Sequence, residues 1–231
     1  MNEISVIDSI LKANDERSCL NRKLLDEKKV YTINLMGSPG AGRTTIIEKL
    51  ISRLKQELNI AVIEGDLFTA MDAQKIESHG VPVVQVNTRG ACHLDAQMLK
   101  KAIDQLNLDR IDLLIIENVG NLACPAEFAL GEDSILTILS TTEGSDKPLK
   151  YPFIFEKSDA VILNKMDLIE FTNFDSLKFF QEVQLLNKNT SLFQTSCRQE
   201  SGLDELCCWL EWKVKAKQES SAVSTSKEVL L

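Results

Sequence analysis

The sequence predicts an α/β fold, a three-layer structure in which a mostly parallel sheet carries helices on both faces. Short apolar runs, many of them β-branched, alternate with segments of helical length along the chain, which is typical of parallel sheets buried on both sides. The first of these runs, Tyr31 to Met36, leads into a glycine-rich turn and then a helical stretch. Strand, glycine-rich turn and helix in this order form the setting of a phosphate-binding loop. We therefore expect a P-loop NTPase fold.

One packed domain, residues 30–215, is expected, because 231 residues with 44% hydrophobic content can bury one sizeable core. Its predicted strands are Tyr31–Met36, Ala61–Glu64, Val83–Val86, Ile111–Glu117, Ile135–Ser140, Ala160–Asn164 and Ser191–Thr195. Its predicted helices are Thr44–Leu58, Met71–Ser78, Leu94–Leu106, Phe174–Leu186 and Leu203–Val214. Residues 1–29 are polar with apolar residues at helical spacing, which predicts a helical appendage of one or two helices. Residues 216–231 are rich in Ser, Lys and Glu, which predicts a disordered tail.

The glycine-rich turn has the spacing of a P-loop with one altered residue. Glycines let consecutive backbone N–H groups close around a β-phosphate, and the helix N-terminus adds a partial positive charge. The predicted nucleotide contacts are Gly37, Ser38, Gly40, Ala41, Gly42, Arg43, Thr44 and Thr45. Thr44 is also a predicted Mg²⁺ ligand. Arg43 stands where the motif has Lys, and the two differ because Lys is a compact point charge whereas Arg is a wide planar fork.

A second motif, Asn164-Lys165-Met166-Asp167, lies at the end of an apolar strand, where a P-loop GTPase has its base-reading loop. The Asp167 carboxylate can accept hydrogen bonds from N1–H and from the exocyclic N2 amine of guanine, whereas adenine offers no matching pair of donors. We therefore predict GTP and GDP as ligands; the alternative is a capped polar turn. The predicted base contacts are Asn164, Lys165, Asp167, Ser196 and Cys197, the last two supplying a backbone amide to guanine O6.

Cys92, His93 and Cys124 are the candidate transition-metal ligands. Two thiolates and an imidazole suit Ni²⁺ or Zn²⁺ and are unattractive to Mg²⁺. Three ligands leave such a site incomplete, and water, a partner protein or the same residues of a second copy across a two-fold axis could complete it. The alternative is that both cysteines are small buried hydrophobes and that His93 is a satisfied surface group.

Two carboxylates follow predicted strands beside the P-loop. Asp66 is a candidate for binding Mg²⁺ through water or for positioning the attacking water, and Glu117 is the other candidate. With Arg43 they form the predicted catalytic set; the alternative for both carboxylates is a solvated strand end. Cys124 is four residues beyond Gly120. Movement of this loop with nucleotide state would therefore move a metal ligand, and each site would influence the other.

Four further segments accompany these motifs in order along the chain. They are Glu64–Asp66, Asn87–Asp95, Glu117–Pro125 and Thr142–Pro152. Together with the two motifs they resemble the HypB family of hydrogenase-maturation GTPases, which is related to the urease accessory GTPase. The resemblance implies a SIMIBI-type G domain that delivers nickel to nickel–iron hydrogenase precursors. It also implies a GTP-dependent homodimer with the metal site at its interface, a nickel-binding maturation partner, and the hydrogenase large-subunit precursor as client.

Charge and hydropathy exclude several classes of partner. The formal net charge of −8 argues against nucleic acid and against anionic membranes, because binding either needs an electropositive surface. No run approaches the ~20 apolar residues of a membrane span, and the first residues lack the apolar core of a signal peptide. We expect a cytoplasmic protein whose six cysteines stay reduced.

Arg43 leaves other functions open. A cation that fits poorly between phosphate oxygens would stabilise phosphoryl transfer less, so the chain could be a nucleotide-dependent metal-binding scaffold with little or no GTPase activity. A small-molecule kinase using the same loop is a further alternative, but it would need an acceptor pocket and usually prefers ATP, against which Asp167 argues. The first 30 residues contain one cysteine and no histidine, so storage of several nickel ions is not expected.

Overall fold

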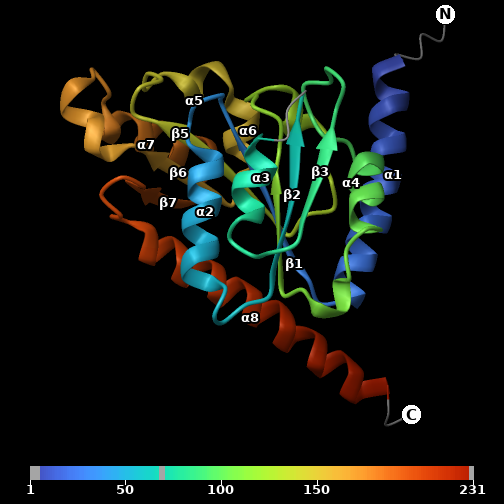
Figure 1. The fold of residues 1–231 in the computed structure, drawn as a ribbon. Coiled ribbons are helices and arrows are strands. Elements are labelled where there is room, and N and C mark those ends of the chain that lie inside the picture. The colour runs from blue at the N-terminus through green and yellow to red at the C-terminus, as the bar shows by residue number, and fades with distance from the viewer. Residues whose placement is uncertain (1–5, 68–70, 229–231) are drawn as a thin grey trace, which may run out of the picture.

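The structure, a computed structural model, describes the backbone of residues 6–67 and 71–228 and the side chains of residues 9–67 and 71–220. Within these ranges seven strands form one sheet in the order β3-β2-β4-β1-β5-β6-β7 (Figure 1). All neighbouring strands are parallel, so the predicted α/β class is confirmed. The strands are β1 (Tyr31–Gly37), β2 (Ile60–Asp66), β3 (Val83–Asn87), β4 (Leu113–Glu117), β5 (Ser134–Ser140), β6 (Ala160–Asn164) and β7 (Ser191–Gln194).

Helices cover both faces of the sheet and give the predicted three layers (Figure 1). One face carries α2 (Arg43–Leu54), α3 (Met71–Glu77) and α8 (Leu203–Glu228). The other face carries α1 (Val6–Glu27), α4 (Ala96–Ile103), α6 (Pro152–Lys157) and α7 (Ser176–Leu186). The shorter elements are α5 (Lys147–Lys150) and the 3₁₀ turns η1 (Leu108–Arg110), η2 (Cys124–Glu127) and η3 (Met166–Phe171).

The central strand β1 packs against both helical layers. Ile33 and Leu35 contact the core beneath α2 and α8, whereas Met36 contacts the core beneath α6 and α7. Successive side chains of a strand point to opposite faces, so a strand buried on both sides carries apolar residues on both. Burial of each such side chain contributes roughly 1.5–3 kcal/mol. Because all strands are parallel, the loops that follow them gather at one edge of the sheet.

The N-terminal segment, predicted as an appendage, is one helix packed into the domain. Leu25 of α1 is fully buried in the core beneath α4. Asn21 is fully buried as well, and its Nδ2 donates to the carbonyl oxygens of Ala96 and Leu130 at 2.8 and 3.0 Å. The polar sequence suggested an external segment, but this polar residue bonds backbone groups of the domain.

The boundary predicted at residue 216 lies inside helix α8, which continues to Glu228. The apolar residues of its first half pack in the core beneath α2. Further along, Lys217 Nζ forms ion pairs with Asp26 of α1 at 2.7 Å and with Asp133 at 2.8 Å. The predicted disordered tail is therefore wrong for the part of α8 that carries these contacts. None of the helices described in the structure is long and apolar enough to cross a bilayer.

Candidate functional site

The P-loop connects β1 to α2 at the edge where the parallel strands end. Gly40 and Gly42 have φ angles of 81° and 99°, a region that favours glycine. A Cβ on Gly42 would lie 2.5 Å from Asn164 Nδ2. The loop therefore needs glycine here both for its backbone conformation and for the close approach of β6. The following residues begin α2, whose first N–H groups face the loop as a phosphate site requires.

Arg43 folds back on the loop that it belongs to. Its Nη1 donates to the carbonyl oxygens of Gly37 and Ser38, the latter at 3.0 Å. Its Nε lies 3.4 Å from Glu117 Oε1, and its side chain is only 14% exposed. A Cβ on Gly120 would lie 3.1 Å from the guanidinium. The altered cation is therefore held by the P-loop carbonyls, by Glu117 and by the loop after β4.

Glu117 ends β4 beside the start of α2, as the sequence predicted. Its Oε1 accepts a hydrogen bond of 2.9 Å from the Thr44 hydroxyl. Burial raises the pKa of this carboxyl, and the charge of Arg43 opposes that effect. Its second oxygen is buried and lacks a hydrogen-bond partner within the described residues. The structure thus brings together Arg43, Thr44 and Glu117 from the predicted set.

A second buried carboxyl, Glu64, was not among the predicted site residues. Glu64 on β2 is the register partner of Glu117 on β4, and it is 3% exposed. Burial, with a further contribution from the Glu117 charge, raises the pKa of Glu64 to about 8. Asp66 ends the same strand, and its Oδ1 accepts from the backbone N–H of Leu67 at 2.6 Å. In the sequence, the only sign of a role for Glu64 is that its carboxyl group ends the otherwise apolar run Ala61–Glu64.

The oxygen atoms gathered here suit a hard cation. Mg²⁺ prefers carboxylate and hydroxyl oxygens; Thr44 and Glu117 provide them beside the P-loop, and Asp66 ends β2, the strand next to β4. Glu64 and Glu117 each have one buried carboxyl oxygen for which no described residue is a hydrogen-bond partner. Since buried polar oxygens without partners are costly, a cation at this edge would offset that cost.

The second motif lies directly against the P-loop. Asn164 Nδ2 donates to the carbonyl oxygen of Ala41 at 3.0 Å, and Lys165 Nζ donates to that of Gly40 at 2.6 Å. Asp167 Oδ1 accepts a hydrogen bond of 2.6 Å from the Ser196 hydroxyl. A cavity of about 340 Å³ opens beside them. Its lining residues are Gly42, Thr45, Asn164, Lys165, Asp167, Leu168, Cys197 and Arg198.

The cavity combines P-loop residues with the predicted base contacts, so it can hold a base attached to a phosphate chain. Cys197 lies at its wall, where its thiol donates to Asn164 Oδ1 at 3.7 Å. Burial raises the pKa of this thiol, so it stays protonated and neutral at physiological pH. Ser196 contributes through its bond to Asp167, which fixes one carboxylate oxygen of a residue that lines the cavity.

The predicted metal ligands are only partly assembled in one copy of the chain. The side chain of Cys124 raises the pKa of the Cys92 thiol, so the two cysteines lie close together. His93 Nδ1 lies 3.7 Å from Cys92 Sγ, but its ring is stacked on Phe128 with centroids 3.8 Å apart. Burial lowers the pKa of this imidazole. Across the described ranges, no group of three or more His, Cys, Asp or Glu residues could hold a metal ion.

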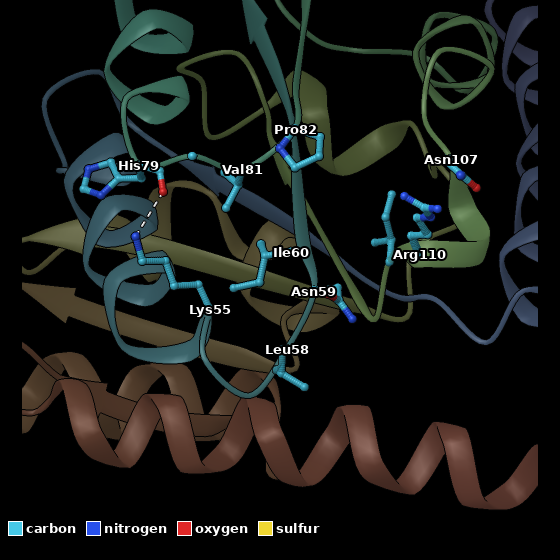
Figure 2. Close-up of a pocket in the computed structure, with 11 residues that line it drawn as sticks. Lys55, Leu58, Asn59, Ile60, His79, Val81, Pro82, Asn107 and Arg110 are labelled. Carbon is cyan, nitrogen blue, oxygen red and sulfur yellow. Dashed lines mark hydrogen bonds between the residues drawn. The ribbon is translucent and has the colours of Figure 1, made fainter.

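A larger cavity, about 690 Å³, lies away from these residues (Figure 2). It opens near the N-terminal ends of β2 and β3, at the edge of the sheet opposite to the P-loop. Lys55 Nζ donates to the carbonyl oxygen of His79 at 3.1 Å on one side, and Arg110 lies on the other. None of the predicted site residues lines this cavity. Size alone would therefore have selected the wrong end of the sheet.

Comparison with known proteins agrees with the geometry. Residues 31–194 match the family described as CobW/HypB/UreG, nucleotide-binding domain. The chain is 41% identical over 218 residues to a probable hydrogenase maturation factor HypB of Methanocaldococcus jannaschii, covering 93% of this chain and 99% of that protein. It is 43% identical to the hydrogenase maturation factor HypB of Escherichia coli (strain K12), covering 90% and 71%. The crystal structure of HypB from Helicobacter pylori in complex with nickel superposes with a TM-score of 0.85 at 36% identity, covering 88% and 96%.

Proposed function

Because this chain belongs to the HypB family of hydrogenase maturation factors, we propose that it is a GTP-binding metallochaperone in which GTP hydrolysis controls nickel delivery during maturation of nickel–iron hydrogenase. The proposal includes a GTP-dependent homodimer, a nickel-binding maturation partner and the hydrogenase large-subunit precursor as client. One observation carries it: the loop that follows Glu117 at the P-loop also carries Cys124, which contacts Cys92.

Binding of guanine nucleotide is supported by the contacts of the second motif. Asp167 is held by Ser196 beside a cavity that P-loop residues also line. A carboxylate in that place accepts the two donors on the guanine edge, and with adenine it would be left unpaired. A bound Mg²⁺ supplies charge neutralisation of the phosphates. Thr44, Asp66 and Glu117 are the residues that would hold it.

Delivery of nickel is supported by the chemistry of the donor atoms. The adjacent thiols of Cys92 and Cys124 suit soft or borderline cations such as Ni²⁺ or Zn²⁺. The ring of His93 lies against Phe128, so completing the coordination requires this ring to turn, or water, a partner protein or a second copy to contribute ligands. A site completed only in the dimer would bind its cargo in one nucleotide state and release it in the other.

Arg43 favours a second candidate, a nucleotide-dependent metal-binding scaffold with little or no GTPase activity. Its guanidinium donates to the carbonyl oxygens of Gly37 and Ser38 and lies beside Glu117. To reach a γ-phosphate it would have to leave these partners, and its fork is wider than the ammonium group that the P-loop motif normally provides. Binding of nucleotide through backbone N–H groups does not need this movement, whereas stabilisation of the transferring phosphoryl group does.

The test is phosphate release from GTP and Mg²⁺ by the native protein beside Arg43→Lys, with Thr44→Ala as the inactive control. We expect slow but measurable release by the native protein that is lost in Thr44→Ala. Native activity comparable to that of Arg43→Lys supports the GTPase. Activity in the Lys variant alone, with both proteins folded and binding GDP, would assign the chain to the scaffold class.

A further inference from the structure

Asn118 is a fully buried residue that directly follows Glu117. Its Oδ1 accepts hydrogen bonds from the backbone N–H groups of Leu94 at 3.1 Å and of Val119 at 2.9 Å. Its Nδ2 donates to Asn34 Oδ1 at 3.1 Å. Leu94 follows His93 in the chain. One side chain therefore joins the loop at the nucleotide site to residues 92–94, the metal segment, which carries two candidate metal ligands.

The same loop holds the other end of that segment through Asn121. The side-chain Nδ2 of Asn121 donates to the carbonyl oxygen of Cys92 at 3.4 Å. The backbone of Asn121 forms an isolated antiparallel bridge with Gly37 of the P-loop. Asn118 therefore contacts Leu94 and Asn121 contacts Cys92, on either side of His93. Both asparagines belong to the loop between Glu117 and Cys124.

The side of Asn118 that faces away from the metal segment is also fixed. Asn34, its partner, lies on β1, the strand that runs into the P-loop, and is fully buried. Asn34 Nδ2 donates to Glu132 Oε1 at 2.9 Å, and Glu132 Oε2 accepts from the backbone N–H of Leu130 at 2.7 Å. Buried amides of this kind keep their partners, because an unpaired buried group costs about 1–3 kcal/mol. The metal segment must therefore follow the loop or lose buried hydrogen bonds.

We propose that Asn118 and Asn121 are positioning residues that transmit a displacement of the nucleotide loop to Cys92 and His93. The proposal rests on the function proposed above, and it identifies the residues through which nucleotide state reaches the metal segment. The competing account is that both asparagines only satisfy local backbone groups. In that case their loss would change stability while leaving the influence of nucleotide on metal affinity unaltered.

The experiment measures the Co²⁺ affinity of the full chain, from the thiolate-to-cobalt absorbance, with GDP and with a non-hydrolysable GTP analogue. The quantity of interest is the ratio of the two affinities. We expect a ratio of about fivefold or more in the native protein, the usual scale of coupling between sites. We expect Asn118→Ala to bring it close to one, while both ligands still bind. Asn121→Ala, at a partly exposed position, should lower the ratio even where Asn118→Ala fails to fold.

Asn187→Ala is the matched control. Asn187 Oδ1 accepts from the N–H of Asn189, and its Nδ2 donates to the carbonyl oxygen of Glu156 at 3.1 Å. Asn121 makes the same two kinds of bond, to Ala123 and Cys92, but Asn187 lies at the end of α7. We expect Asn187→Ala to keep the native ratio of the Co²⁺ affinities measured with GDP and with the GTP analogue.

A metal-free readout accompanies the titration. The rate of Cys92 alkylation, measured by peptide mass spectrometry with GDP and with the GTP analogue, should differ in the native protein and become equal in the two asparagine variants. Native-like ratios in folded Asn118→Ala or Asn121→Ala would overturn the inference while leaving the proposed function intact. A native ratio of one in both readouts would overturn the proposed function and the inference with it.

Discussion

The base end and the phosphate end of the nucleotide site differ in how their polar groups are satisfied. At the base end, Asn164, Lys165 and Asp167 bond to the P-loop backbone or to Ser196. At the phosphate end, Glu64 and Glu117 keep buried oxygens without a partner among the described residues. Polar groups that already have partners need little rearrangement to bind a ligand, whereas buried oxygens without partners gain from a ligand or ion that supplies them. The two ends therefore test different parts of the proposed function.

The largest effect is expected at the base end. Asp167→Ala removes the acceptor for two guanine donors, so we expect GDP affinity to fall about 100-fold, or about 2.7 kcal/mol. Isothermal titration with GDP measures this without depending on hydrolysis. Asp175→Ala, which removes the N-cap of α7, is the control and should leave GDP affinity unchanged. If Asp167→Ala lowers GDP affinity less than threefold, the base end is not the recognition element and the contrast between the two ends does not hold.

The next effect concerns Glu64 at the phosphate end. Its pKa is about 8 in the folded protein against an ordinary value of 4.5, so the folded state holds a proton that the unfolded state releases. The contribution of this group to stability is therefore lost as pH rises from about 4.5 to about 8. Glu64→Gln removes the ionisation, and we expect the variant to be about 2 kcal/mol more stable than the native protein at pH 8.5.

Chemical denaturation of both proteins at pH 4.5 and pH 8.5 checks this expectation. The difference between them should be small at the lower pH, because Glu64 is then protonated in the folded state and still half protonated in the unfolded state. Glu127→Gln, at an exposed position of η2, controls for removal of one charge. If the native protein and Glu64→Gln were equally stable at both pH values, ionisation of Glu64 at the phosphate end would not destabilise the folded state.

The smallest effect concerns the metal segment beside the phosphate end. Stacking of His93 on Phe128 holds the imidazole, and such a contact contributes about 0.5–1.5 kcal/mol. We expect Phe128→Leu to raise Co²⁺ affinity about fivefold, because the ring becomes free to turn toward the thiols. Phe171→Leu, a change at a highly exposed ring, should have no effect. An unchanged or lower affinity in Phe128→Leu would show that His93 acts from its stacked position or does not act at all.

The contiguous parts of the site could be predicted from the sequence, because each motif carries its own local geometry. The P-loop and Asn164–Asp167 are of this kind, and the strands that precede them were located by their apolar runs. Glu64 could not be recognised, because its role depends on the register of β2 against β4. Asn118 likewise acquires its role from the approach of Leu94. Residues that act through pairing of distant strands leave no local pattern.

The errors at the two termini have one physical cause. Helix α1 buries asparagines that bond to backbone carbonyls, and the later part of α8 attaches through an ion-paired lysine. Hydropathy treats such residues as solvated, so α1 and the later part of α8 were predicted to lie outside the packed domain. The stacking of His93 on Phe128 was invisible for a related reason, since the two residues meet only in the folded chain. Burial of polar groups with partners is the feature that pattern analysis misses most easily.

The pairing of Lys217 with Asp26 and Asp133 also sets an order for biosynthesis. Asp26 on α1 and Asp133, just before β5, are both synthesised before Lys217 on α8. Until α8 leaves the exit tunnel of the ribosome, a nascent chain can pair these two carboxylates with Arg22 of α1 and lacks the second cation, Lys217. The full set of contacts around these carboxylates is therefore completed only once α8 has emerged and packed on the domain.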